Sequence, residues 1–286
     1  KVHKSNKMDL GIKDRIIIVT GGAKGIGASI VKGISKEGGI PIIVGRSEKV
    51  GKLLADEIAA NGGQAYNIVH ELGKGNTCKE IVEEIIDEFG SIYGLVNNAG
   101  FNDSIGLENG SPDQFMSSIQ TNLSHYYDMA HYCCPYLKRT KGAIVNISSK
   151  TALTGQGNSS GYAASNGAQL ALTREWAVEL APFKIRVNAI VPAEVMTPQY
   201  QKWITTFQNH EEVLDEIKLK VPLGQRMTDA EEIAHTCLFL LSDKSLHTTG
   251  QWLFVDGGYV HLDRAMNGQD SLAKSNAIEM EMENHK

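Results

Sequence analysis

The sequence predicts an α/β protein built on a parallel β-sheet. Short β-branched runs alternate with longer segments of helical spacing along most of the chain, which is the pattern of repeated strand–helix–strand units. The runs are continuously apolar, as at residues 16–19, and this is typical of strands that helices cover on both faces. Since no linker rich in Pro, Gly or Ser interrupts the series, we expect a single doubly wound domain over residues 9–263.

Strands and helices are expected in regular alternation. β-Branched and aromatic residues predict strands at 15–20, 41–45, 65–69, 93–97, 143–148, 185–191 and 251–255. Apolar residues recurring with the helical period predict helices at 28–37, 50–61, 79–89, 114–137, 162–180 and 230–242. Residues 193–223 fall outside this series and are expected to form a mobile helical flap over the substrate. The polar ends, 1–8 and 264–286, are expected to be disordered and to lie outside the domain.

Composition excludes several classes of function. The 286 residues carry 28 Lys and Arg against 33 Asp and Glu, a net charge of −5, which argues against a nucleic-acid partner. No apolar run approaches the ~20 residues of a membrane span. The four cysteines, Cys78, Cys133, Cys134 and Cys237, have neither CxxC nor metal-ligand spacing. These features predict a cytoplasmic protein with reduced cysteines and no metal site.

A glycine-rich turn separates the first predicted strand from the first predicted helix. It reads Thr20-Gly-Gly-Ala-Lys-Gly-Ile-Gly27, with Gly21, Gly25 and Gly27 in a TGxxxGxG spacing. Glycines at such a junction let the backbone approach a pyrophosphate, and the helix N-terminus supplies N–H donors and a positive dipole. The turn predicts a dinucleotide site, although tight turns without ligands share this composition.

The end of the second strand bears on the choice of dinucleotide. An acid there would bind the ribose 2′-hydroxyl of NAD, whereas an Arg accepts the 2′-phosphate of NADP. The chain has Gly45-Arg46-Ser47 at this place, and Lys24 in the glycine turn is a second cation near the same corner. We therefore expect NADP as the preferred cofactor and NAD as the other candidate. The alternative is that both cations are solvated surface charges.

Five motifs follow one another along the chain: the glycine turn, Asn97-Asn-Ala-Gly100, Asn122, Ser149 and Tyr162. Asn122 lies 40 residues before Tyr162, and Ser149 lies 13 before it. With these motifs the chain resembles the short-chain dehydrogenases/reductases over about residues 9–260. The resemblance implies a single Rossmann-type domain with a seven-stranded parallel sheet flanked by helices. It also implies NAD(P)-dependent hydride transfer and a homotetramer.

A finer resemblance rests on four short runs: Asn146-Ile-Ser-Ser-Lys-Thr-Ala152, Gly155-Gln-Gly157, Pro192-Ala-Glu-Val-Met-Thr197 and Val255-Asp-Gly-Gly-Tyr-Val-His-Leu-Asp263. These runs are similar to those of bacterial aldose 1-dehydrogenases of the L-fucose type. Such enzymes oxidise the anomeric carbon of an aldopyranose to a lactone. The resemblance thus implies a small sugar as substrate, whereas the residues alone indicate only a polar pocket.

The resemblance also implies roles for individual residues. Tyr162 is expected to act as general base, Ser149 to orient the substrate oxygen and Asn122 to serve in a proton relay. Besides the glycine turn, Lys24 and Arg46, the implied cofactor-binding residues are Ile26, Glu71, Leu72, Asn98, Ala99, Gly100, Tyr162, Asn166, Val195 and Thr197. Gln156 and Glu194 follow strands at the edge where open α/β sheets bind ligands. We expect them to join Ser149 and Tyr162 in binding substrate.

One position departs from the family pattern. The activating Lys that the family has four residues after the tyrosine is Asn166 in Tyr162-Ala-Ala-Ser-Asn166. A tyrosine hydroxyl has a pKa near 10, so only ~0.1% is ionised at pH 7 unless a cation lowers that pKa. Because Asn166 carries no charge, we expect catalysis to be slowed by about 10²–10⁴-fold. Lys150 is not expected to replace the missing cation, because adjacent side chains on a strand point to opposite faces.

Three explanations of Asn166 are open at this point. The first is an introduced Lys-to-Asn change. The second is a natural divergence that retains weak activity or works at higher pH. The third is a nucleotide-binding or scaffolding protein without turnover. Within the enzyme class, the alternative to a sugar dehydrogenase is a dehydrogenase of another alcohol, such as a steroid or a polyol.

Overall fold

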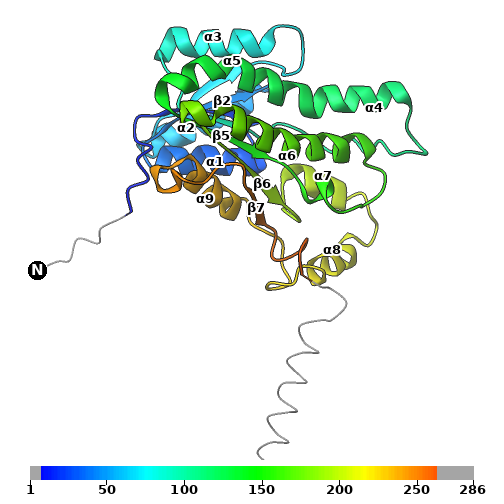
Figure 1. Cartoon of the computed structure of the whole chain (residues 1–286). Coiled ribbons are helices and arrows are strands. Elements are labelled where there is room, and N and C mark those ends of the chain that lie inside the picture. Colours follow the sequence, from blue (N-terminus) through cyan, green and yellow to red (C-terminus); the bar gives the residue numbers. More distant parts are fainter. Residues whose placement is uncertain (1–7, 263–286) are drawn as a thin grey trace, which may run out of the picture.

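The computed structural model describes residues 8–262, so the expectations for residues 1–7 and 263–286 lie outside the described residues. Its strands are β1 Ile16–Thr20, β2 Ile40–Gly45, β3 Tyr66–Val69, β4 Gly94–Asn97, β5 Ala143–Ile147, β6 Arg186–Pro192 and β7 Trp252–Val255. They form one sheet in the order β3-β2-β1-β4-β5-β6-β7, and every neighbouring pair is parallel (Figure 1). The predicted seven-stranded parallel sheet is confirmed, and its strands begin and end close to the expected residues.

Helices cover both faces of the sheet. They are α1 Gly25–Lys36, α2 Glu48–Ala60, α3 Thr77–Phe89, α4 Pro112–Ile119, α5 His125–Thr140, α6 Ser160–Leu180, α7 Pro198–Ile204, α8 His210–Leu219 and α9 Ala230–Leu241. Strand β1 shows how one sequence serves two cores, because successive side chains of a strand point to opposite faces. Ile17 and Val19 pack with α1, α2 and α9, whereas Ile16 and Ile18 pack with α3, α5 and α6.

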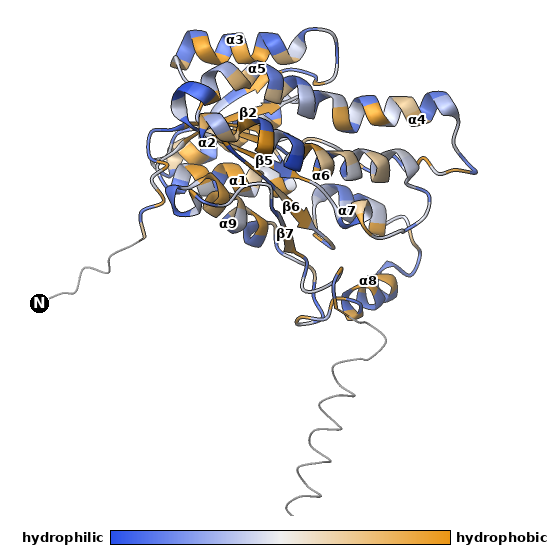
Figure 2. Cartoon of the chain, viewed as in Figure 1, coloured by the Kyte–Doolittle hydropathy of each residue, from blue (hydrophilic) through white to orange (hydrophobic). Residues whose placement is uncertain are grey.

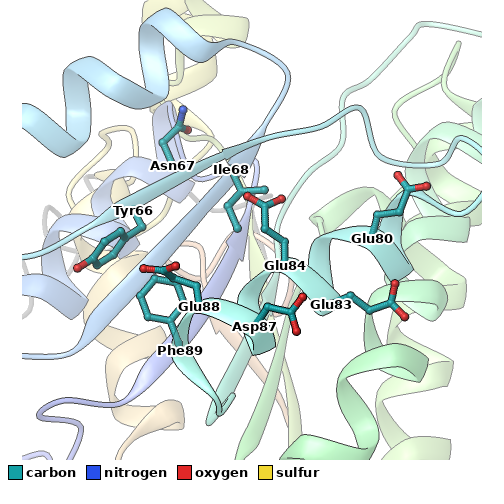
Figure 3. A pocket seen from close by; sticks show the side chains of 9 residues that line it. All are labelled: Tyr66, Asn67, Ile68, Glu80, Glu83, Glu84, Asp87, Glu88 and Phe89. Atoms are coloured by element: carbon teal, nitrogen blue, oxygen red, sulfur yellow. The ribbon is translucent and has the colours of Figure 1, made fainter.

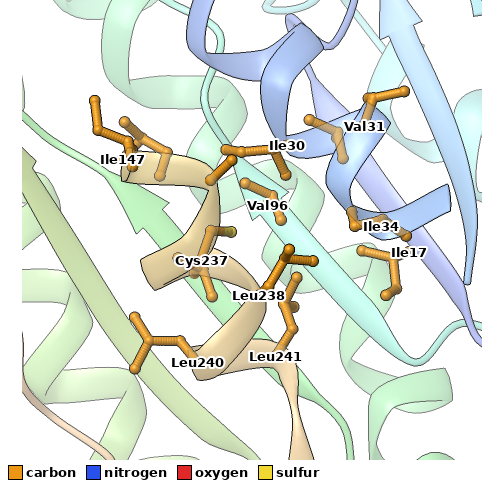
Figure 4. Close-up of a cluster of buried hydrophobic side chains, with 14 of the residues drawn as sticks. Ile17, Ile30, Val31, Ile34, Val96, Ile147, Cys237, Leu238, Leu240 and Leu241 are labelled. Carbon is orange, nitrogen blue, oxygen red and sulfur yellow. The ribbon is translucent and has the colours of Figure 1, made fainter. Parts of the chain in front are cut away.

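Figure 4 shows the first of these cores, in which Ile30 and Ile34 of α1 lie near Leu238 and Leu241 of α9. Gly33 lies at the contact between the two helices, where a Cβ atom would lie 2.9 Å from Leu238 Cδ1, the end of a side chain. The hydrophobic colour in Figure 2 is correspondingly concentrated on the central strands. All four cysteines are free thiols, as expected, and three of them are buried in these cores.

The prediction of one continuous helix at 114–137 is wrong. A π-helical turn, η1 Gln120–Ser124, divides this segment into α4 and α5. Asn122 lies buried in this turn. Its backbone carbonyl accepts a hydrogen bond from Gln169 Nε2 of α6 at 2.9 Å. Diverting a carbonyl from the helical ladder to a neighbouring side chain favours a wider turn, and such turns are frequent at functional sites.

The segment predicted as a flap, residues 193–223, contains α7 and α8 and is therefore helical as expected. It leaves the sheet at the carboxyl end of β6. Its mobility stays a prediction, as do the domain limits 9–263. Within residues 8–262, no helix combines the length and the apolar composition that crossing a membrane requires.

Candidate active site

The glycine turn lies where the strand order reverses, between β1 and β4, which is the place where open α/β sheets bind ligands. Gly21 and Gly25 have φ values of +64° and +54°, a region that other residues rarely adopt. A Cβ atom at Gly27 would lie only 2.4 Å from the Gly21 carbonyl oxygen. The turn therefore requires these glycines and leaves its backbone accessible to a ligand.

Residues after β4 hold the turn in place. The Asn98 side-chain amide donates to the Thr20 carbonyl at 2.9 Å. The backbone N–H groups of Asn98 and Ala99 donate to Thr20 Oγ1 at 2.9 and 3.1 Å. The structure thus brings Asn98 and Ala99 to the glycine turn, and the exposed Gly100 follows them.

The N-terminus of α1 is suited to an anion. Lys24 is its N-cap residue, no side chain caps the helix there, and the first turn contains no acid. The N–H groups and the positive end of the helix dipole are therefore not neutralised by a side chain of the helix. Together with the bare glycine backbone, this end fits the diphosphate of a dinucleotide. Ile26 is partly buried, and its side chain packs against the first core.

Thr197 closes the other side of the turn. A Cβ atom at Gly25 would lie 3.3 Å from Thr197 Cγ2, so the start of the flap borders the glycine turn directly. Thr197 is also the N-cap residue of α7, where its Oγ1 accepts a hydrogen bond from the Tyr200 N–H at 3.2 Å. Val195 is buried two residues earlier. Thr197 thus lies beside the glycine turn and Val195 packs in the first core, while their expected contacts with the dinucleotide stay predictions.

Arg46 and Glu71 follow neighbouring strands, β2 and β3, at the corner where the adenosine end is expected. Both side chains are exposed. A hydrogen bond from Lys74, together with the charges of Lys74 and Arg46, holds the pKa of Glu71 below its usual range. Leu72 is partly buried, and its side chain packs against the second core. The corner therefore holds two cations, Arg46 and Lys74, and a carboxylate that lies close to them.

Ser149, Tyr162 and Asn166 come together at the end of β5 and in the first turns of α6. Burial raises the pKa of Tyr162 above its usual value, and hydrogen bonding with Ser149 and Asn166 lowers it by less. Asn166 is buried, and its side-chain amide donates to the backbone carbonyl of Tyr162 at 2.8 Å. The tyrosine therefore has two neutral partners, and its net pKa shift is opposite to the one that a general base at neutral pH needs.

Hydrogen bonds fix both the side chain and the backbone of Asn122. Its Oδ1 accepts from the Phe101 N–H at 2.8 Å, its Nδ2 donates to the Ser118 carbonyl at 3.1 Å, and its backbone carbonyl accepts from Gln169. Gln169 was missed by the sequence analysis. The only signal was its position seven residues after Tyr162, two helical turns along the same face of α6.

The two predicted substrate residues differ. Gln156 is exposed, and its amide donates to Ser159 Oγ at 3.1 Å within its own loop. Glu194 is buried and forms an ion pair with Lys150, the residue directly after Ser149. Its second carboxylate oxygen accepts a hydrogen bond from the Tyr200 hydroxyl at 2.9 Å. Lys150 is thus engaged with a carboxylate, which agrees with the expectation that it does not replace the missing cation.

A groove of about 620 Å³ lies elsewhere, between the edge strand β3 and helix α3 (Figure 3). It is lined by five carboxylates together with Tyr66, Asn67, Ile68 and Phe89; the five are Glu80, Glu83, Glu84, Asp87 and Glu88. Such a concentration of negative charge disfavours a phosphate-containing ligand. In the part of the chain that the structure describes, no group of three or more His, Cys, Asp or Glu residues is placed to hold a metal ion.

Comparison with known proteins agrees with this site. The family profile described as Enoyl-(Acyl carrier protein) reductase matches residues 21–260. The 3-oxoacyl-(acyl-carrier-protein) reductase FabG of Thermotoga maritima is 32% identical over 250 residues, 87% of this chain and 99% of that protein. The probable galactose dehydrogenase GalD of Rhizobium meliloti is 32% identical over 250 residues, 86% and 95% of the two chains. L-Fucose dehydrogenase of Rattus norvegicus is 30% identical over 245 residues, 85% and 88% of the two chains.

Solved structures have the same fold. The crystal structure of the Cj0485 dehydrogenase superposes with a TM-score of 0.86 at 47% identity, covering 91% of this chain and 99% of the other. Aldohexose dehydrogenase (AldT) of Thermoplasma acidophilum superposes with a TM-score of 0.80 at 30% identity, covering 88% and 96%. The fold, the glycine turn, the residues at the end of β5 and these matches lead to one conclusion. The chain belongs to the short-chain dehydrogenase/reductase family, whose members are NAD(P)-dependent oxidoreductases.

Proposed function

We propose that this protein oxidises an aldose, L-fucose or a similar sugar, at its anomeric carbon to the lactone. The observation that carries the proposal is the grouping of Tyr162, Ser149 and Asn166 near the end of β5, at the same carboxyl edge of the parallel sheet as the glycine turn. The galactose, L-fucose and aldohexose dehydrogenases among its relatives support a sugar as substrate. The finer similarity to bacterial enzymes of the L-fucose type rests on the four short sequence runs described above.

The chemistry requires that the anomeric hydroxyl lose its proton while the anomeric C–H bond gives up a hydride. A nicotinamide dinucleotide, when bound, supplies the hydride acceptor. Tyr162 accepts the hydroxyl proton, and Ser149 donates a hydrogen bond to the same oxygen and so holds it near the tyrosine. Asn122 serves in the relay that returns the proton to solvent. Asn166 keeps a hydrogen bond to this site but provides no charge to stabilise the phenolate.

The cofactor is proposed to be NADP in preference to NAD. The support is the exposed Arg46 at the end of β2, with Lys24 in the turn, and the lack of an acid among Gly45, Arg46 and Ser47. The cofactor residues are those of the glycine turn together with Glu71, Leu72, Asn98, Ala99, Gly100, Val195 and Thr197. Gln156 and Glu194 are proposed to complete the sugar site. A homotetramer and a cytoplasmic location also remain predictions.

Two other functions have specific support. The oxidation of an alcohol that is not a sugar is supported by relatives such as the cyclopentanol dehydrogenase of Comamonas testosteroni. A nucleotide-binding or scaffolding protein without turnover agrees with the raised pKa of Tyr162 and with the neutral Asn166. The first alternative predicts turnover of an alcohol that is not a sugar, and the second predicts nucleotide binding without turnover at any pH.

Asn166→Lys tests the proposal directly. We expect oxidation of L-fucose at pH 7 to rise by about 10²–10⁴-fold, because the ammonium lowers the pKa of Tyr162. Steady-state rates with L-fucose, D-galactose and a cyclic alcohol, each with NAD and NADP, measure this. Asn166→Met is the matched control, because it has a similar length to Lys and no charge.

The outcomes separate the candidate functions. A gain with sugars in Asn166→Lys that is lost on adding Tyr162→Phe supports the proposal. A gain confined to the cyclic alcohol would replace the sugar with another substrate. Nucleotide binding without turnover in either chain would favour the binding protein.

A further inference from the structure

The two ends of the flap are held together, because Glu194 and Val195 at its start contact Thr228, which lies shortly after its end. The Thr228 N–H donates to the Glu194 carbonyl at 2.8 Å, and Val195 pairs with Thr228 in a parallel β-bridge. The arm that leaves β6 and the arm that leads to α9 are therefore held side by side. Only the backbone of Glu194 takes part in this contact, so its side chain can bond to other segments.

The side chain of Glu194 links the base of the flap to three further segments. One carboxylate oxygen contacts the Lys150 ammonium, just beyond β5, and the other accepts from the Tyr200 hydroxyl of α7 at 2.9 Å. The Lys150 ammonium also lies 4.1 Å from the centre of the Tyr259 ring, beyond β7. The four residues thus connect the ends of β5, β6 and β7 with the first helix of the flap.

These charges are costly to bury. The side chains of Lys150 and Glu194 are only 11% and 8% exposed. An ion pair taken out of water loses hydration that its mutual attraction repays only with good geometry, and apolar side chains of similar volume often give equal or greater stability. Stability alone therefore does not explain the pair. Its directional bonds specify one position for α7, which an apolar contact would leave less defined.

That position matters because of what lies at each end of the network. Lys150 directly follows Ser149, which contacts Tyr162. Tyr200 lies one helical turn after Thr197, which borders the glycine turn at Gly25. A shift of α7 would therefore move Thr197 away from the backbone that fits the diphosphate.

We propose that Lys150, Glu194 and Tyr200 form a positioning network that holds the start of the flap against the glycine turn and thereby sets the affinity for the dinucleotide. None of the three needs to touch the dinucleotide for this effect. The inference rests on the proposed function only in so far as that function requires a nicotinamide dinucleotide. It gives Glu194 a second role beside its proposed contact with the sugar. It also gives a role to Lys150 and Tyr200.

The network makes a distinctive prediction for combined substitutions. Lys150→Met or Glu194→Gln alone breaks the buried ion pair while keeping one of its two charges, and we expect each to weaken NADP binding by about 10-fold or more. The double variant removes both charges and is expected to bind NADP more tightly than either single variant, because the two positions are coupled. Tyr200→Phe removes one hydrogen bond only and is expected to weaken binding by about 3-fold.

The experiment measures NADP and NAD dissociation constants by calorimetry, thermal unfolding, and hydrogen exchange of residues 198–219 in the absence of sugar. We expect faster exchange in α7 for the variants that bind weakly. Asp215→Asn is the control, since it breaks only the exposed pair with Lys218 in α8, 2.9 Å apart, and should alter neither quantity. Tyr200→Phe, which leaves the ion pair intact, provides the test if a charge variant fails to fold.

Folded single variants at Lys150 or Glu194 that bind the dinucleotide as tightly as the unaltered chain, or that exchange in α7 at its rate, would overturn the proposal. Single variants whose effects simply add in the double variant would also overturn it. So would an unaltered chain that binds neither dinucleotide. Failure of the sugar proposal looks different, because dinucleotide affinity would then respond to the network while no sugar is oxidised, even by Asn166→Lys.

Discussion

The nucleotide side of the candidate site, around the glycine turn, and its catalytic side, around Tyr162, depend on different physical interactions. On the nucleotide side, Gly21 and Gly27 create space, and Thr20 and Asn98 fix the backbone around it. On the catalytic side, Ser149 and Asn166 lie beside Tyr162, but both are neutral, and the proposed role of the tyrosine as a base calls for a charge that Asn166 does not carry. Dinucleotide binding is therefore expected to depend mainly on the shape of the turn, whereas turnover is expected to depend on one electrostatic interaction that Asn166 does not supply.

The pH dependence of turnover should expose this difference most strongly. Because the pKa of Tyr162 lies above its usual value of about 10, its ionised fraction rises about tenfold for each pH unit below that pKa. The rate of the unaltered chain should therefore rise by about 10³-fold from pH 7 to 10. Steady-state rates across this range measure it, with circular dichroism to confirm that the fold persists.

In Asn166→Lys the profile should flatten near neutral pH, since a lowered pKa ionises Tyr162 earlier. The advantage of the Lys variant should accordingly shrink as the pH rises. Parallel profiles for the two chains would contradict the assignment of Tyr162 as the base.

Gly27→Ala should disable the nucleotide side. The added Cβ atom would meet the Gly21 carbonyl at 2.4 Å and Asn98 Nδ2 at 2.7 Å, so the turn must move. We expect the affinity for NADP to fall by about 100-fold, measured by calorimetry. Gly33→Ala is the matched control in the same helix, because its Cβ atom meets only the flexible end of Leu238. Normal NADP binding by Gly27→Ala would show that the diphosphate does not use this turn.

Arg46→Ala should have a smaller and selective effect. Loss of the guanidinium removes a partner of the 2′-phosphate, so NADP affinity should fall by about 10-fold while NAD affinity stays the same. The two dissociation constants measure this selectivity. Lys49→Ala, which removes an exposed cation three residues along, should change neither value. Equal losses for both dinucleotides would mean that Arg46 is not a 2′-phosphate ligand.

Local patterns in the chain were sufficient to predict most of the fold. Continuous apolar runs such as Ile16–Thr20 and the helical spacing between them follow directly from a sheet buried on both faces. The glycine turn was equally visible, because a bare backbone can be encoded only by glycine. The replacement at Asn166 was visible because Tyr162 and residue 166 lie one helical turn apart, so their proximity is a property of the helix itself.

Contacts between distant segments were decided by the tertiary structure. Lys150 and Glu194 are 44 residues apart, and they meet because β5 and β6 are neighbours in the sheet. The π turn at Asn122 likewise depends on Gln169, which belongs to another helix. The direction of the pKa shift of Tyr162 depends on how deeply packing buries it. The sequence contains the residues of these interactions, but burial and pairing across the sheet exist only once the chain has folded.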